Sequence, residues 1–209
     1  LHILGYFLNW TDPLLAQRLS SLRDSRHTRN PKIVQRLNEL GIPITYEEVR
    51  ALAGTESVGR PHIARLLMEK KFVTSAKEAF DRYLANGRPA FVDRELPLPA
   101  QAVQWIREAG GVPVLAHPTW VRTSADGLRT LIRELKATGL GGIEVHYSTH
   151  TPSQTTEYLE LAKQCDLVVT GGSDFHGVTK PDIEVGIGRG QLKVSEKLLD
   201  PLRKAATTA

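Results

Sequence analysis

The residues best suited to do chemistry follow a short apolar run in the C-terminal third of the chain. Residues 167–170 read Leu-Val-Val-Thr and lead into Gly171-Gly-Ser-Asp-Phe-His-Gly177. A β-branched run that ends in glycines is typical of a buried strand entering a loop. In an extended segment, residues two apart project to the same side, so Asp174 and His176 can reach one point. A carboxylate and an imidazole at one point suit a divalent metal ion.

Two further histidines stand beside strand-like runs. The apolar residues 112–116 end at His117, and His2 opens the strand-like residues 1–9. We therefore expect His2, His117, Asp174 and His176 to be metal ligands. Nitrogen and oxygen donors without thiolate favour Mn, with Fe or Zn as alternatives, over a cysteine-rich structural zinc site. The alternative is that each histidine is an ordinary hydrogen-bonded residue, and the Asp-Phe-His sequence after two glycines argues against it for Asp174 and His176.

From Pro99 onward, helical and strand patterns alternate, which predicts an α/β fold with parallel βα units. The expected helices are 102–109, 128–137 and 153–164, and the expected strands are 112–116, 142–145 and 167–170. Sites in such folds gather at the carboxyl ends of the strands. All four candidate ligands are expected there, whereas the tail from Lys193 is expected on the surface.

Residues 12–98 contain no convincing central strand, which predicts that they form an inserted, all-helical domain. Residues 1–11 and 99–209 are expected to form the α/β part. Thr11-Asp12-Pro13 is a helix-start signal. Asn30-Pro31 is expected to interrupt that helix, and the next apolar stripe ends at Gly41.

Basic residues of the helical part are candidates for binding phosphate. Arg23, Arg26 and Arg29 recur at every third position and form a stripe, although a solvated charged face explains the same spacing. Arg60, His62 and Arg65 surround a predicted helix N-terminus, where free N–H groups bind anions and guanidinium groups match phosphate oxygens. Capping and surface ion pairs are the alternative there.

His146 and His150 follow the strand at 142–145 and are further candidates for contacting the substrate.

Composition is that of an ordinary globular protein. The 209 residues carry 24% charged and 41% hydrophobic side chains, with a formal charge of +4 that permits an anionic substrate. One cysteine excludes an intramolecular disulfide and agrees with a cytoplasmic location. No apolar run approaches the ~20 residues that span a bilayer, so no membrane partner is expected. The sequence offers no basis for inferring a protein partner.

Several of these motifs together resemble a known family. Ala116-His-Pro118, Gly172-Ser-Asp-Phe-His176 and His2-Ile-Leu-Gly5 are similar to the later motifs of the PHP (polymerase and histidinol phosphatase) superfamily. Ser57-Val-Gly-Arg-Pro-His-Ile-Ala-Arg65 and Ala79-Phe-Asp-Arg-Tyr-Leu84 resemble its YciV/TrpH-like branch. The resemblance implies an incomplete, distorted (β/α)7-like barrel with an inserted helical lobe. Members of the family also begin with His-x-His, Asp, His and Glu ligands that this sequence does not show, so we expect the chain alone to be impaired in catalysis.

The resemblance implies a metal-dependent phosphoesterase in which metal-activated water hydrolyses a nucleoside 3′,5′-bisphosphate or a short 5′-phosphorylated RNA. It implies no catalytic residue beyond the metal ligands, in agreement with the lack of a serine or cysteine nucleophile motif. Two alternatives stay open. One is a small-molecule phosphatase of the histidinol phosphate type, against which the helical insertion argues, and the other is a nucleotide- or RNA-binding module without catalysis.

Overall fold

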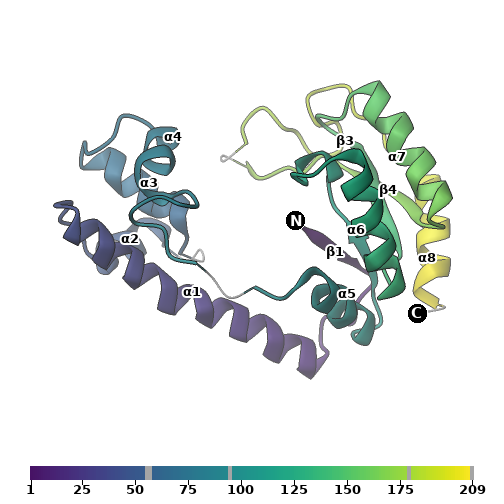
Figure 1. Cartoon of the computed structure of the whole chain (residues 1–209), viewed down its shortest axis with the longest axis horizontal. Coiled ribbons are helices and arrows are strands. Elements are labelled where there is room, and N and C mark those ends of the chain that lie inside the picture. Colours follow the sequence, from purple (N-terminus) through teal and green to yellow (C-terminus); the bar gives the residue numbers. More distant parts are fainter. Residues whose placement is uncertain (55–57, 94–95, 178–179, 208–209) are drawn as a thin grey trace. The chain divides into compact units, whose positions relative to one another are not determined.

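A computed structural model describes residues 1–54, 58–93, 96–177 and 180–207. The chain divides into two compact units, which are considered separately (Figure 1). The sheet unit comprises Leu1–Ala16 and Pro97–Ala209, and the helical unit comprises Gln17–Leu96. The boundaries predicted from the sequence lie between residues 11 and 12 and between residues 98 and 99. None of the helices in the described ranges is both long and apolar enough to cross a membrane.

The sheet unit contains a four-stranded sheet in the order β1-β2-β3-β4. Its strands are Ile3–Tyr6 (β1), Val112–Leu115 (β2), Gly142–Tyr147 (β3) and Val168–Gly172 (β4). The last three strands are parallel, which confirms the predicted βα units. Strand β1 pairs antiparallel to β2, with Ile3 opposite Leu115. Because of this reversal, the beginning of β1 lies at the same edge as the ends of the other strands.

Helices α5 (Pro99–Glu108), α6 (Ala125–Ala137) and α7 (Pro152–Gln164) connect the strands. The side chains of Ser124 and Thr151 cap the N-termini of α6 and α7, as polar residues at that position commonly do. Apolar faces of α6 and α7 bury a core against β3 that includes Ile132, Ile143 and Leu161. The fold is therefore α/β, as predicted.

Most residues of the C-terminal tail are exposed, as predicted, but one side of its helix is buried. After the short 3₁₀ turn Glu196–Leu198 (η4), helix α8 (Leu199–Thr207) packs on the sheet. Leu202 of this helix is only 2% exposed and contacts the cluster of Val112 and Val114. The few apolar residues of α8 lie within a charged stretch. Their helical periodicity was therefore too weak to predict that one face of this helix is buried.

The helical unit contains α2 (Tyr46–Ala53), α3 (Arg60–Glu69), α4 (Ala76–Ala79) and the one-turn π-helix η1 (Phe80–Leu84), together with most of α1 (Pro13–Glu39). Helix α2 begins with a complete capping box between Thr45 and Glu48. The unit has a core of its own, whose fully buried residues include Ile33, Leu37, Val49, Ile63, Leu67 and Leu84.

The predicted interruption of the first helix at Asn30-Pro31 is wrong, because α1 continues through Pro31 to Glu39. A proline within a helix removes one backbone hydrogen bond. Here the Asn30 side chain is fully buried and donates to the carbonyl of Val58 at 2.9 Å. Ile33 and Leu37 in the following turns are also fully buried. Tertiary packing therefore outweighs the local effect of the proline.

Candidate active site

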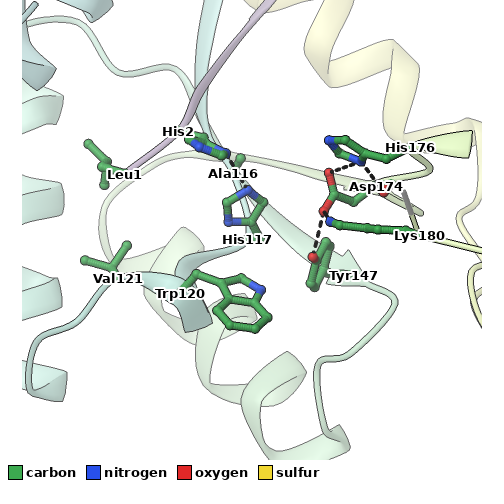
Figure 2. Close-up of a pocket in the computed structure, with 10 residues that line it drawn as sticks. All are labelled: Leu1, His2, Ala116, His117, Trp120, Val121, Tyr147, Asp174, His176 and Lys180. Carbon is green, nitrogen blue, oxygen red and sulfur yellow. Dashed lines mark hydrogen bonds and ion pairs between the residues drawn. The ribbon is translucent and has the colours of Figure 1, made fainter. Parts of the chain in front are cut away.

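A pocket of about 410 Å³ lies at the sheet edge where β1 begins and β2 and β4 end (Figure 2). It contains all four side chains that the sequence predicts as metal ligands. His2 comes from the start of β1, His117 follows β2, and Asp174 and His176 follow β4. The remaining lining residues are Leu1, Ala116, Trp120, Val121, Tyr147 and Lys180.

Two of the histidines contact each other directly. His2 Nδ1 lies 3.0 Å from His117 Nε2, and the two rings meet edge to face. Burial lowers the pKa of both imidazoles, which favours their neutral forms. The Nδ1 atom of His117 is buried and has no hydrogen-bond partner in the described part of the chain. Neutral imidazole is the form that binds a metal ion.

The second pair of predicted ligands belongs to a network around Asp174. Its Oδ2 accepts a hydrogen bond from the Tyr147 hydroxyl at 2.9 Å and another from the Lys180 ammonium group. His176 Nδ1 lies 3.4 Å from Oδ1 of the same carboxylate. Partial burial alone would raise the pKa of Asp174, but the hydrogen bonds from Lys180 and Tyr147 outweigh it, and the pKa is lowered. The carboxylate is therefore charged at neutral pH.

Tyr147 is the neutral donor of this network. Burial raises its pKa to about 12, and the hydrogen bond to the Asp174 carboxylate adds to the shift. The Tyr147 ring also lies 5.5 Å from the His117 ring, measured between centroids. Tyr147 thus connects the histidine pair to the Asp174 network.

Left-handed backbone conformations help to place two of these side chains. His117 has φ +27° and Asp174 has φ +59°, which non-glycine residues seldom adopt. Each residue follows a strand at the point where the chain turns. Such conformations persist only where surrounding contacts hold them, and they are common at functional sites.

Glu144 provides one of those contacts and was not identified from the sequence. Its side chain is 4% exposed, and its Oε2 accepts the backbone N–H of His117 at 2.8 Å. Burial raises the pKa of Glu144 to about 7, although the hydrogen bond from His117 acts in the opposite direction. The sequence signal that could have identified Glu144 is a carboxylate within the apolar run of β3. Nothing in the sequence distinguished Lys180 or Tyr147.

The fit to a metal ion is partial. The nitrogen and oxygen donors have the chemistry of a Mn, Fe or Zn site, and the unpartnered His117 Nδ1 is a further donor. However, no three His, Cys, Asp or Glu side chains within the described ranges are grouped closely enough to hold a metal ion. The four candidates form two pairs, and the Lys180 ammonium group occupies one oxygen of Asp174. A complete metal site would need further ligands.

His146 does not line this pocket. It lies in a second pocket of about 440 Å³ together with His150 and Lys193, and Tyr147 lines both pockets. The strand β3 has an irregular register between Glu144 and His146. Alternation along a regular strand therefore does not predict the direction of His146.

Within the helical unit, Arg60 makes contacts of its own. Its Nη1 donates to the carbonyl of Leu84 at 3.0 Å, and its guanidinium carbon lies 5.7 and 5.6 Å from the ring centroids of Phe80 and Phe91. These contacts join the N-terminus of α3 to η1. They give Arg60 a structural role whether or not it also binds phosphate.

The other predicted basic residues also lie in the helical unit. His62 Nδ1 accepts the N–H of Gly59 at 3.1 Å, so it caps the helix α3 that it belongs to. Arg65 pairs with Glu69 one turn later at 3.0 Å. Arg23 is exposed on α1, and the side chain of Arg26 lies outside the described part of the structure. The binding of phosphate by these residues stays a prediction.

Comparison with known proteins identifies relatives with phosphoesterase names. No protein-family model matches the chain. It is 36% identical over 176 residues to a 5′-3′ exoribonuclease of Haemophilus influenzae, covering 84% of this chain and 64% of that protein. It is 33% identical over 186 residues to the 5′-3′ exoribonuclease Rnm of Escherichia coli, covering 89% and 63%. It is 31% identical over 186 residues to a 3′,5′-nucleoside bisphosphate phosphatase of Chromobacterium violaceum, covering 88% and 65%. The chain thus spans somewhat less than two thirds of the length of these relatives.

Two solved structures have a similar fold. One was assigned as a metal-dependent phosphoesterase from Bifidobacterium adolescentis and is 27% identical, with a TM-score of 0.79 and coverage of 98% of this chain and 71% of that one. The other is described as an amidohydrolase from Chromobacterium violaceum with bound sulfate and no metal. It is 28% identical, with the same TM-score and coverage. Together with the sequence relatives, these matches confirm the resemblance that the motifs indicated.

Proposed function

As this chain is a relative of the PHP-type phosphoesterases, we propose that it forms the larger part of a divalent-metal-dependent hydrolase of nucleotide phosphoesters. The observation that carries the proposal is the pocket in which His2, His117, Asp174 and His176 meet from three strand ends. The names of the relatives support RNA or a nucleoside 3′,5′-bisphosphate as the substrate. For the RNA, we propose a short, 5′-phosphorylated chain, as the family resemblance implies.

The residues of the pocket have distinct tasks in this proposal. His2 and His117, both neutral, and His176 offer imidazole nitrogens to the metal, while Asp174 offers a charged carboxylate. A bound divalent ion supplies an activated water molecule and stabilises charge on the phosphate oxygens. Glu144 holds the backbone of His117 through its N–H. Tyr147 and Lys180 fix the orientation of Asp174 and keep it charged.

Further ligands complete the metal site in this proposal, since the described residues provide no group of three. Mn is the first choice of metal, with Fe or Zn as alternatives. We also propose that the sheet unit is part of a distorted (β/α)7-like barrel and that the helical unit is an insertion into it. The length of the relatives beyond the matched region leaves room for both the additional ligands and the additional strands.

A nucleotide- or RNA-binding module without catalysis is the second candidate. The absence of a three-ligand group within the described ranges is the observation that favours it. Hydrolysis distinguishes the two candidates, because a binding module would retain affinity for nucleotides without releasing phosphate.

The test is phosphate release from a nucleoside 3′,5′-bisphosphate by the protein with its natural flanking sequence and Mn. Asp174→Ala should reduce kcat/KM by about a hundredfold or more, because a metal ligand is lost. Asp126→Ala is the matched control, since Asp126 lies in the first turn of α6 and outside the pocket. The hydrolase would be refuted by wild-type protein that binds these ligands but, with Mn, Fe or Zn, neither releases phosphate from the bisphosphate nor shortens a 5′-phosphorylated RNA.

A further inference from the structure

Lys180 holds a position in the candidate active site that a metal ion on Asp174 would need. Its ammonium group pairs with Oδ2 of Asp174, and Figure 2 shows the two side chains in contact. The Tyr147 hydroxyl donates to the same oxygen at 2.9 Å. Because a carboxylate oxygen has two lone pairs, these two donors use both of them. A metal ion that binds Oδ2 must therefore replace one of the donors.

Lys180 is the donor that can leave. Tyr147 is only 7% exposed, and its ring packs between those of His117 and His150, with centroid distances of 5.5 and 5.1 Å. The Lys180 side chain is 39% exposed and carries its charge on a flexible four-carbon stem. Its ammonium group can therefore exchange the Asp174 carboxylate for water, whereas movement of Tyr147 would disrupt packed rings.

The charge of Lys180 also acts on the histidine pair. Burial is the main cause that lowers the pKa of His2 and His117, and the positive charge of Lys180 contributes to the lowering in both. The ammonium group thus acts on predicted ligands of both pairs, as a metal ion shared between them would. A metal ion that used Oδ1 of Asp174 instead would also lie close to this charge, and two cations repel each other.

We propose that Lys180 sets the metal affinity of the site by competing with the metal ion for Asp174. Before a metal ion binds, the ammonium group neutralises the carboxylate and holds it in place. When a divalent ion binds, Lys180 leaves Asp174 and turns to solvent, while the Tyr147 hydroxyl keeps the carboxylate oriented. The inference rests on the proposed function, because it takes Asp174 as a metal ligand. It implies that the site fills at a higher Mn concentration than the same ligands would require without this lysine.

The test is the Kd for Mn, measured by electron paramagnetic resonance in the protein with its natural flanking sequence. Lys180→Met removes the charge and keeps the length of the side chain. Because a charge-assisted contact no longer competes, Mn should bind about ten- to hundredfold more tightly than to the wild type. Lys163→Met is the matched control with the same change in net charge, since Lys163 is exposed in the last turn of α7 and outside the pocket. Its Mn affinity should equal that of the wild type.

Two further variants show whether the competition acts through the charge and through Asp174. Tyr147→Phe removes the neutral donor and no charge, so Mn should bind no more tightly than to the wild type. In Asp174→Ala the lysine has no carboxylate to hold, so the addition of Lys180→Met should change the weakened Mn affinity by no more than about twofold. Tighter binding in Tyr147→Phe, or a gain from Lys180→Met as large without Asp174 as with it, would overturn the inference.

Urea unfolding followed by tryptophan fluorescence gives a second readout. An ion that binds only the folded protein raises the unfolding midpoint according to its affinity. The same Mn concentration should therefore raise the midpoint further in Lys180→Met than in the wild type, and an equal rise would contradict the competition. Lys180→Gln keeps a neutral donor to Asp174 and replaces the methionine variant if that protein does not fold. Its Mn affinity should also exceed that of the wild type.

These outcomes separate the inference from the proposed function. If Asp174→Ala binds Mn as tightly as the wild type, or if neither the wild type nor Lys180→Met binds Mn, both proposals fail. If Asp174→Ala weakens Mn binding but Lys180→Met binds Mn no more tightly than the wild type, only the competition is refuted. Binding of Mn without hydrolysis refutes the hydrolase alone, because the Kd values still decide the role of Lys180.

Discussion

Replacement of Arg60 by alanine should destabilise the helical unit, because the side chain joins α3 to η1. The lost contacts are the hydrogen bond to the Leu84 carbonyl and the two positions over Phe80 and Phe91. A hydrogen bond from a charged group contributes roughly 1.5–3 kcal/mol, and a partly exposed cation–π contact about 0.5–1 kcal/mol. Such terms overlap, so the free energy of unfolding of the helical unit should fall by about 2–4 kcal/mol.

Hydrogen exchange measured by mass spectrometry tests this loss of stability separately in each unit. Peptides from α3 and η1 should lose protection in Arg60→Ala by an amount that corresponds to this free energy. All three tryptophans, Trp10, Trp105 and Trp120, lie in the sheet unit, so their fluorescence in urea reports on that unit as an internal control. Arg65→Ala is the matched control within α3, since its exposed pair with Glu69 contributes about 0.5 kcal/mol at most.

Unchanged protection in Arg60→Ala would refute the structural role. The prediction from the sequence, that Arg60 binds a second phosphate, would then be tested by comparing a bisphosphate with a simple phosphate ester. It requires a loss in kcat/KM of about ten- to hundredfold on the bisphosphate alone. Destabilisation without that selective loss would remove Arg60 from substrate binding.

Three further outcomes are expected. Because the pKa of Glu144 is raised from 4.5 to about 7, the folded metal-free chain binds the extra proton, and its stability should fall by up to about 3 kcal/mol as the pH rises from about 4.5 to above 7. Urea unfolding followed by tryptophan fluorescence should show a smaller pH dependence in Glu144→Gln, and an identical dependence would contradict the assignment. Asn30→Ala should cost about 1–3 kcal/mol, seen as faster exchange in α1, because the Val58 carbonyl loses its buried donor; unchanged exchange would count against that role. Finally, the 209-residue chain alone should bind Mn more weakly than the protein with its natural flanking sequence, and equal affinities by calorimetry would show that no further ligand is needed.

Local patterns were enough to locate the parts of the fold that depend on short-range signals. The α/β class and the parallel strands β2, β3 and β4 were predicted because each strand is a short apolar run between helical patterns. His117 and Asp174 could be located in the same way, since His117 directly follows such a run and Asp174 lies in the loop after one. Their role as metal ligands stays a prediction.

Features that depend on contacts distant in the sequence were missed. The antiparallel pairing of β1 is not encoded in its four residues, and the continuation of α1 through Pro31 depends on packing of Asn30 and its neighbours. The contact between Lys180 and Asp174 is closer in the sequence, since the two residues are six apart, but no motif marked it. His146 lines the second pocket and follows an irregular register in β3, which the sequence does not show.

In the proposed function, His117 and Asp174 bind a catalytic metal ion in the pocket at the strand ends. Titration of Mn followed by electron paramagnetic resonance measures this directly in the protein with its natural flanking sequence. We predict that His117→Ala weakens Mn binding by about tenfold to a hundredfold, while Asp126→Ala leaves it unchanged. Wild-type affinity for Mn in His117→Ala, in a protein that remains folded, would show that His117 is not a metal ligand.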